Sequence, residues 1–229
     1  MKKTITCIIP FLNEGQRISS VLSEIVKVRN IDQIIAVDGG STDDGYLEIK
    51  KFPQVKLIKL ENNIGKTGTV AKGLEETQSD YILLYDADLT NVNYLEIESV
   101  IDKITEDEKI DMIIFNRNTP RLITKLNRLE LLFSGERILK RLDFLKILKT
   151  NPTGFQLETA INTYMIKNKK NVYWTQSSNT NLPKVNKFGG IRGEINNLKM
   201  FWEVFKYDPL SYIYQLLFFG KHEINHNEK

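Results

Sequence analysis

The stretch Tyr81-Ile82-Leu83-Leu84-Tyr85-Asp86-Ala87-Asp88-Leu89-Thr90-Asn91 joins an apolar, β-prone run to two carboxylates one residue apart. Alternate residues of an extended strand share a face, so Asp86 and Asp88 can converge on one point. Two converging carboxylates favour a hard cation, and such cations are often bound by substrate phosphates as well. The alternative is an ordinary acidic turn after a buried strand, because Asp is also a frequent turn residue.

The residues around this stretch alternate short apolar runs with amphipathic segments as far as residue 115. Such alternation predicts an α/β fold with a mostly parallel central sheet, flanking helices and right-handed crossovers. We expect strands over 4–9, 34–37, 55–60, 81–85 and 112–115, and helices over 16–29, 46–51, 68–76 and 94–104. After residue 115 the alternation stops. There we expect a largely helical segment over 120–149, a helix over 155–167, a strand over 172–175 and a loop over 177–193.

Composition narrows the class of protein. The chain has 229 residues, 41% of them hydrophobic, which is enough to bury a full core. A net charge of +3 does not by itself indicate a nucleic-acid binder. The single cysteine, Cys7, lies in an apolar run and rules out a disulfide within the chain, which suits a reducing, cytoplasmic compartment. No signal-peptide pattern and no apolar run near the ~20 residues of a membrane helix is evident.

Two segments are unusual in composition. Residues 121–150 hold eight Lys or Arg against three Asp or Glu, and residues 198–220 hold eight of the 22 aromatic residues. The basic segment fits phosphates, an anionic membrane face or nucleic acid, or else is a solvated helical face. The aromatic segment either packs on its own domain or on a homodimer partner, as is more common for such a stripe, or makes peripheral contact with the inner membrane face.

Each expected strand of the first half ends in polar residues. Ligands of parallel α/β sheets bind at the carboxyl ends of the strands, so these residues are the candidate site. A crevice with Glu14, Asp38, Lys66, Asp86 and Asp88 on one edge suits a nucleotide diphosphate. The carboxylates can accept hydrogen bonds from ribose hydroxyls or a base N–H. The lysine can bind phosphate, and the acidic pair can hold a divalent ion.

Three other nucleotide or metal motifs are excluded. A P-loop ending at Gly65-Lys66-Thr67 would need glycine at position 60, which is leucine. No Gly-x-Gly-x-x-Gly pattern follows the first expected strand. Zinc-type spacing is missing, because the only histidines, His222 and His226, lie in a polar terminal segment.

The strand-end motifs together resemble those of family 2 glycosyltransferases. They are Ile8–Glu14, Val37–Asp43, Asn63–Lys66 and Tyr85–Asp88, in that family's order. The resemblance implies a GT-A fold, a nucleotide-diphosphate sugar as donor, and Mg²⁺ or Mn²⁺. It implies metal binding by Asp86 and Asp88, with residues 1–117 as the nucleotide-sugar-binding half and 118–229 as the acceptor side of one continuous domain. The nucleotide-sugar-binding residues that it implies are Pro10, Asn13, Glu14, Asp38, Gly40, Lys66 and Asp86.

The second half resembles the polyprenyl-phosphate (dolichol-phosphate-type) branch of the family more loosely. The resemblance rests on Phe115-Asn116-Arg117, Ser134–Arg137, Gly154–Glu158 and Lys187–Gly190. A similar Gly-x-x-x-Glu element occurs in transferases that glycosylate phosphoglycerate. The acceptor implied is a lipid phosphate or a small hydroxyl or phosphate compound.

Catalysis admits two routes. For a hydroxyl acceptor, a carboxylate base is needed; Glu158 is the first candidate and Glu136 the second, although a carboxylate at a helix start also satisfies the helix dipole. A phosphate acceptor is already ionised, and Arg117 and Arg137 would then bind it, unless they form surface ion pairs. Rival functions are a sugar-phosphate nucleotidyltransferase and a non-catalytic nucleotide-sugar-binding protein.

Overall fold

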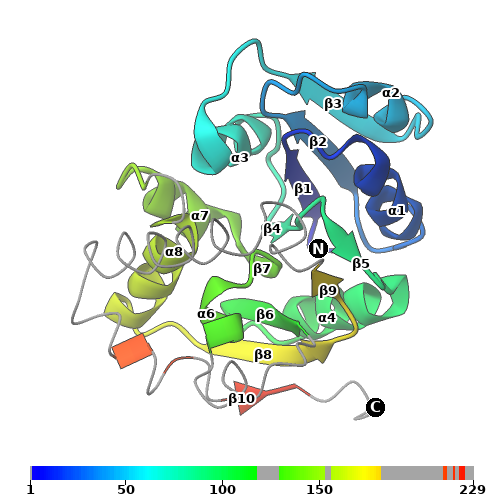
Figure 1. The fold of residues 1–229 in the computed structure, drawn as a ribbon. Helices are drawn as coiled ribbons and strands as arrows, with labels where there is room; N and C mark the ends of the chain where they lie inside the picture. Colours follow the sequence, from blue (N-terminus) through cyan, green and yellow to red (C-terminus); the bar gives the residue numbers. More distant parts are fainter. Residues whose placement is uncertain are drawn as a thin grey trace.

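A single eight-stranded sheet organises the chain (Figure 1). The structure, a computed structural model, describes residues 2–117, 129–152, 156–181, 214–215, 219 and 222–224. The strand order is β10-β8-β6-β7-β4-β1-β2-β3. The strands of this sheet are β1 (Ile5–Phe11), β2 (Gln33–Asp38), β3 (Val55–Lys59), β4 (Tyr81–Leu84), β6 (Met112–Arg117), β7 (Arg137–Lys140), β8 (Val172–Ser177) and β10 (His222–Glu223). Strands β5 (Leu89–Thr90) and β9 (Thr180–Asn181) form a second, antiparallel sheet.

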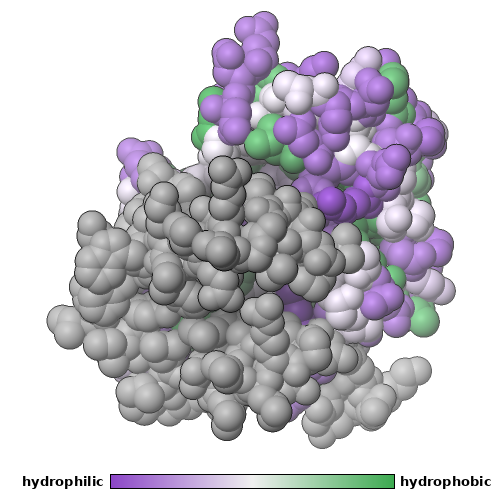
Figure 2. Space-filling model, in the orientation of Figure 1, coloured by the Kyte–Doolittle hydropathy of each residue, from purple (hydrophilic) through white to green (hydrophobic). Residues whose placement is uncertain are grey.

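Helices cover both faces of the large sheet, each burying an apolar stripe against it. The helices of the first face are α1 (Gly15–Ile25), α2 (Gly45–Ile49) and α4 (Tyr94–Glu106), whose buried residues belong to one core cluster. Those of the second face are α3 (Gly65–Glu75), α6 (Leu129–Phe133), α7 (Arg141–Leu148) and α8 (Gln156–Lys167), which share the other cluster. The described surface in the view of Figure 2 is mostly hydrophilic, with scattered apolar groups.

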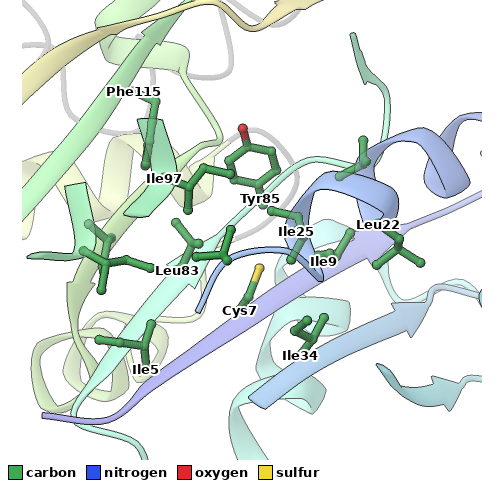
Figure 3. Packing of buried hydrophobic residues seen from close by; sticks show 14 of the residues in the cluster. Ile5, Cys7, Ile9, Leu22, Ile25, Ile34, Leu83, Tyr85, Ile97 and Phe115 are labelled. Carbon is green, nitrogen blue, oxygen red and sulfur yellow. The ribbon is translucent and has the colours of Figure 1, made fainter. Parts of the chain in front are cut away.

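The alternation of side chains along β1 separates the two cores. Cys7 and Ile9 point to the first core, whereas Ile8 belongs to the second. Figure 3 shows Cys7 between Ile9, Leu83 and Ile34. Burial raises the pKa of the Cys7 thiol far above its usual value, so this cysteine fills the core as the sequence indicates.

The predicted α/β alternation is confirmed for the first half of the chain. Strands β1, β2, β3 and β4 pair in parallel, and β8 pairs in parallel with β6. The observed helices and strands lie within a few residues of the expected ranges. Because the chain goes from β1 to one side and then returns to β4 on the other, the topological switch point lies between β1 and β4.

The expectation of a largely helical segment over 120–149 was wrong in part. Residues Arg137–Lys140 form β7, which is antiparallel and lies between β4 and β6, near the middle of the sheet. Its sequence, Arg-Ile-Leu-Lys, is only four residues long and has a charge at each end, so no local pattern marks it as a central strand. The residues 177–181, expected as a loop, also complete β8 and form β9.

Several sequence expectations lie mostly or wholly outside the described residues. They concern the residues 121–128 of the basic segment, the motif residues Gly154 and Lys187–Gly190, and nearly all of the aromatic segment 198–220. In the part of the chain that is described, no helix has the length and apolar character that a membrane span requires.

The central position of β7 gives a stability prediction. Ile138 is fully buried, pairs with Leu83 and Ile113, and belongs to the first core, whereas Leu142 of α7 is 67% exposed. We expect Ile138→Ala to lower the free energy of unfolding by about 2–5 kcal/mol, because it leaves a cavity in the core. The matched control Leu142→Ala should change it by less than ~0.5 kcal/mol. Equal midpoints in urea for the two variants would contradict the placement of β7.

Candidate active site

The candidate site lies at the carboxyl ends of β1, β2 and β4, on both sides of the switch point. The β1–β4 ladder ends at the pair Ile8–Leu84, whereas the β1–β2 ladder continues to Phe11–Asp38. Strands β1 and β4 therefore stop pairing before β1 ends. Pro10 lies beyond the last β4 pair, where its missing N–H costs no ladder hydrogen bond. The strand-end residues predicted from the sequence are distributed along this edge, and among them Lys66 and Asp86 are in direct contact.

On the β2 side, Asp38 is fully buried and partly unpartnered. Its Oδ1 accepts from the backbone N–H groups of Gly40 (3.2 Å) and Ser41 (2.7 Å). Its Oδ2 is buried and has no hydrogen-bond partner among the described residues. A buried carboxylate oxygen without a donor is costly, so a ligand N–H or O–H at this point would supply what is missing.

The turn after β2 needs its glycine. Gly40 has φ +92°, and a Cβ there would lie 3.0 Å from the carbonyl carbon of Asn62 in the β3–α3 loop. A side chain would therefore strain the backbone and push that loop away from the β2 turn. Gly40 therefore permits a close approach of the loops after β2 and β3, and its contact with a nucleotide sugar stays a prediction.

Asn13 and Glu14 hold the loop after β1. Asn13 has φ 55°, donates from its N–H to Ser41 Oγ (2.9 Å) and accepts at Oδ1 from the N–H of Thr42 (2.9 Å). Glu14 is the N-cap residue of α1 and forms a 2.6 Å ion pair with Arg17. Asn13 therefore joins the β1 and β2 loops, and Glu14 stands at the start of α1, in the loop after β1.

Asp86 is held between two cations. Its Oδ1 lies 2.9 Å from Lys66 Nζ and its Oδ2 lies 2.8 Å from Arg117 Nη2. Burial opposes ionisation, but Lys66 and Arg117 more than compensate and hold the pKa of Asp86 well below its usual range. The carboxylate is consequently ionised and fixed in orientation.

Both cations are shared with a second carboxylate from the other half of the chain. Lys66 Nζ lies 2.8 Å from Glu158 Oε1 at the start of α8, and Arg117 Nε lies 2.5 Å from Glu136 Oε2. Glu158, from the predicted acceptor side, therefore contacts Lys66 of the predicted donor side, and Arg117, a candidate for binding an acceptor phosphate, contacts Asp86. Glu136, the second candidate base, is fully buried, and both of its oxygens accept hydrogen bonds from Arg117, so it is not placed to receive an acceptor proton.

Arg137 is not exposed at this edge of the sheet. Its side chain is fully buried, and it donates to the carbonyl oxygen of Ser134 from Nε and Nη2 and to Asn162 Oδ1 from Nη1 (2.9 Å). Burial lowers the pKa of this arginine. The geometry does not support the expected contact of Arg137 with acceptor phosphate. No sequence pattern indicated this burial, because it results from the pairing of β7 with β4 and β6, and β7 was not predicted.

Asp88 lies in the turn between β4 and β5 and interacts electrostatically with Arg117. The described residues contain no group of three or more His, Cys, Asp or Glu side chains that could hold a metal. Two carboxylates of one turn fit a Mg²⁺-type ion, which typically takes one or two carboxylates and completes its shell with water and substrate phosphates. The donor set therefore fits an ion that arrives with a phosphate ligand.

The turn that carries Asp86 and Asp88 is held from the opposite side by residues 177–181. Tyr85 is buried and accepts a 2.6 Å hydrogen bond from Asn179 Nδ2, while Thr90 pairs with Thr180 across β5 and β9. Glu96 accepts from the N–H of Ser178. Sequence reasoning missed this support, since the only signal was a run of small polar residues.

Comparison with known proteins agrees with this architecture. The model of glycosyl transferase family 2 matches residues 6–189, so the chain belongs to that family. It is 27% identical over 176 residues to the dolichyl-phosphate beta-glucosyltransferase of Dictyostelium discoideum, covering 68% of this chain and 54% of that protein. It is 27% identical over 121 residues to the glucosyl-3-phosphoglycerate synthase of Mycobacterium tuberculosis, covering 48% of this chain and 37% of that protein.

The fold is that of a solved glycosyltransferase. The crystal structure of the same M. tuberculosis synthase with phosphoglyceric acid superimposes with a TM-score of 0.72 at 18% identity, covering 89% of this chain and 79% of the other. The expected GT-A fold is thereby confirmed. The chain spans about half the length of the dolichyl-phosphate relatives that it matches.

The burial of Arg137 gives a test of its structural role. We expect Arg137→Met to lower the free energy of unfolding by roughly 2–5 kcal/mol, because it leaves the Ser134 carbonyl and the Asn162 amide oxygen without their donor. The control Lys149→Met, at an exposed position after α7, should change it by less than ~0.5 kcal/mol. Chemical unfolding measures both values. An Arg137→Met protein of unchanged stability would show that the buried guanidinium does not support the fold.

Proposed function

We propose that this chain transfers a sugar from a nucleotide-diphosphate sugar to an acceptor that carries a phosphate, with the help of Mg²⁺ or Mn²⁺. One observation carries the proposal. The buried Asp38, with its unpartnered oxygen, and the charged cluster around Asp86 lie at the same sheet edge, on opposite sides of β1. Two strand spacings separate β2 from β4, roughly 10 Å, so a ligand that contacts both is extended.

The residues divide between the two ends of such a donor. Asp38 is the acceptor for a base N–H or ribose hydroxyl, and the loops that Asn13 and Gly40 join form that end. Lys66 lies in the first turn of α3, where its ammonium and the helix N-terminus favour phosphate. Glu14 and Pro10 line the β1 edge between them.

The charge of the cluster explains why a divalent cation is part of the proposal. Four carboxylates (Asp86, Asp88, Glu136 and Glu158) are grouped with three cationic side chains (Lys66, Arg117 and Arg137), which leaves an excess of one negative charge when all are ionised. Burial raises the pKa of Glu136, and with this carboxyl protonated the cluster is neutral. In either state the cluster has no excess of positive charge to offset the charge of a diphosphate. When bound, the ion offsets it and stabilises the negative charge that develops on the leaving diphosphate.

Asp86 and Asp88 are both proposed ligands of the ion. Both oxygens of Asp86 contact cationic side chains, so an ion at Asp86 would compete with Lys66 and Arg117 for that carboxylate.

Relatives suggest the donor and the acceptor. Crystal structures of the M. tuberculosis synthase contain UDP and phosphoglyceric acid with Mn²⁺, or UDP with Mg²⁺. Other relatives are named dolichyl-phosphate beta-glucosyltransferases. Their acceptors share a phosphate, attached to a small acid in one case and to a lipid in the other. We propose UDP-glucose or a similar sugar nucleotide as donor and a phosphate-bearing acceptor.

Whether the transfer needs a general base depends on which oxygen of the acceptor attacks the sugar. If a hydroxyl attacks, Glu158 is the proposed base, because its carboxylate reaches Lys66 at the donor side while α8 belongs to the acceptor side. If a phosphate oxygen attacks, no base is needed, and Arg117 orients the acceptor through its edge nearest Asp86.

Three wider expectations stay proposals. The first is that residues 1–117 bind the donor and 118–229 the acceptor within one domain, which the shared sheet supports. The second is that a basic and aromatic C-terminal part brings the protein to the inner membrane face from the cytoplasm, which would suit a lipid acceptor. The third is a homodimer. Binding to vesicles of anionic lipid and analytical ultracentrifugation test the last two.

Donor binding is the first prediction of this proposal. In calorimetric titrations with UDP-, GDP- and ADP-sugars, we expect one donor to bind tightly with Mn²⁺ and weakly without it. Asp88→Ala should abolish the metal-dependent part and the transfer, with an unchanged far-UV circular dichroism spectrum. Asp102→Asn, on the exposed side of α4, should bind like the wild type. If no donor binds the folded wild-type protein, the transferase proposal is lost.

The effect of Glu158→Gln distinguishes the two acceptor classes. With an acceptor whose hydroxyl attacks, we expect kcat to fall by roughly 10²–10⁴-fold, the usual contribution of a general base. With an acceptor whose phosphate attacks, kcat should change by far less. The comparison uses 3-phosphoglycerate and a short-chain polyprenyl phosphate as the two acceptors. Unchanged rates with both would remove Glu158 from the proposed mechanism.

A further inference from the structure

Glu136 is a buried carboxylate that, among the described residues, is in direct contact with one cationic side chain, that of Arg117. Its Oε1 accepts from Arg117 Nη2 (2.6 Å) and its Oε2 from Arg117 Nε (2.5 Å), a two-point contact that fixes the plane of the guanidinium. The same Nη2 donates to Asp86 Oδ2 at 2.8 Å. Arg117 thus cannot rotate about its contact with Asp86 without breaking both contacts with Glu136.

The backbone around Glu136 is itself fixed to β6. Ser134 Oγ lies 2.7 Å from the carbonyl oxygen of Phe115 and 3.0 Å from Glu136 Oε2, and the Glu136 carbonyl accepts from the N–H of Phe115 (3.1 Å). Ser134 and Glu136 are both buried. The segment Ser134–Glu136 is therefore a rigid support that joins β7 to the end of β6.

Gly135 brings this support into contact with Asp86. A Cβ at Gly135 would lie 2.7 Å from Asp86 Oδ1, 2.8 Å from its Cγ and closer still to Oδ2. Real Cβ atoms essentially never approach other heavy atoms so closely. The carboxylate could move away only by losing its contacts with Lys66 and Arg117, so the absence of a side chain at residue 135 is a condition for the observed position of Asp86.

We propose that Glu136 and Gly135 are positioning residues of the transferase site: Glu136 orients Arg117 so that its Nη2 holds Asp86, and Gly135 leaves the space that the Asp86 carboxylate occupies. This inference rests on the proposed function and replaces the role of base that the sequence suggested for Glu136. In this inference, Gly135 and Glu136, from the second half of the chain, hold Asp86 of the first half in position.

The test compares Glu136→Gln with Glu98→Gln. Glutamine keeps the shape of the side chain and removes its charge. Glu98 is a matched control, because it is a buried carboxylate that accepts 3.1 Å hydrogen bonds from both Nε and Nη2 of Arg29, away from the site. We expect Glu136→Gln to lower kcat/KM for the sugar nucleotide, and the affinity for its nucleoside diphosphate with Mn²⁺, by roughly 10–100-fold, as is usual for partners of site residues. Glu98→Gln should leave both unchanged.

A double-mutant cycle with Arg117→Lys separates positioning from general stabilisation. If Glu136 acts through Arg117, the two losses in kcat/KM overlap, and the double variant is hardly worse than Arg117→Lys alone. If Glu136 only stabilises the fold, the two losses multiply. Gly135→Ala should reduce kcat/KM at least as strongly, because it displaces Asp86 directly.

A measurement on the protein without bound donor tests this inference separately from the proposed function. In ¹⁵N NMR spectra of the free protein, the Arg117 Nε–H resonance should exchange slowly in the wild type and in Glu98→Gln, and rapidly in Glu136→Gln. An unchanged resonance in Glu136→Gln would overturn the proposal whether or not transfer is observed, and so would unchanged kinetics. A wild-type protein that transfers no sugar, with the resonance behaving as expected, would overturn the proposed function and the catalytic part of this inference, but not the contact itself.

Discussion

The structure of the site depends on one ionised carboxylate, that of Asp86, held between Lys66 and Arg117. Its position connects elements distant in sequence: Lys66 belongs to α3, Arg117 ends β6, and their second partners, Glu158 and Glu136, begin α8 and precede β7. Removing either cation would leave a largely buried charge underpaired, which is strongly destabilising. The cluster therefore fixes the two halves of the chain against each other at the sheet edge where ligands of such folds bind.

Within the large sheet, some residues would contact the donor and others hold those residues in place. The strands β1, β2 and β4 supply the side chains that the proposed donor would contact, each at a strand end. Strand β6 supplies Arg117, the segment before β7 supplies Glu136, and α8 adds Glu158, and these side chains hold the donor-facing ones in place. All three supporting side chains are largely buried, which is the arrangement expected of a site whose geometry must not change as a charged ligand enters.

The sequence predicted the parts of the site that local patterns encode. Asp38, Asp86 and Asp88 follow apolar runs directly, so their place at the carboxyl edge followed from the α/β alternation. Strand β7 was not predictable in this way, because its four residues acquire their position only by pairing with β4 and β6. Arg137 and Glu136 were misassigned for the same reason: their burial is a consequence of that pairing. The contact of Lys66 with Glu158 joins residues 92 positions apart, which no local pattern indicates.

The most direct test of the account follows the phosphorus atoms of the donor. The wild-type protein and Mg²⁺ are incubated with the sugar nucleotide that binds and each phosphate-bearing acceptor, and, in a parallel reaction, with a nucleoside triphosphate and a sugar phosphate. The products of both reactions are identified by ³¹P NMR. The account predicts a nucleoside diphosphate and a glycosylated acceptor, formed in equal amounts. Release of pyrophosphate from a nucleoside triphosphate and a sugar phosphate, with no diphosphate formed from the sugar nucleotide, would contradict it and indicate a nucleotidyltransferase.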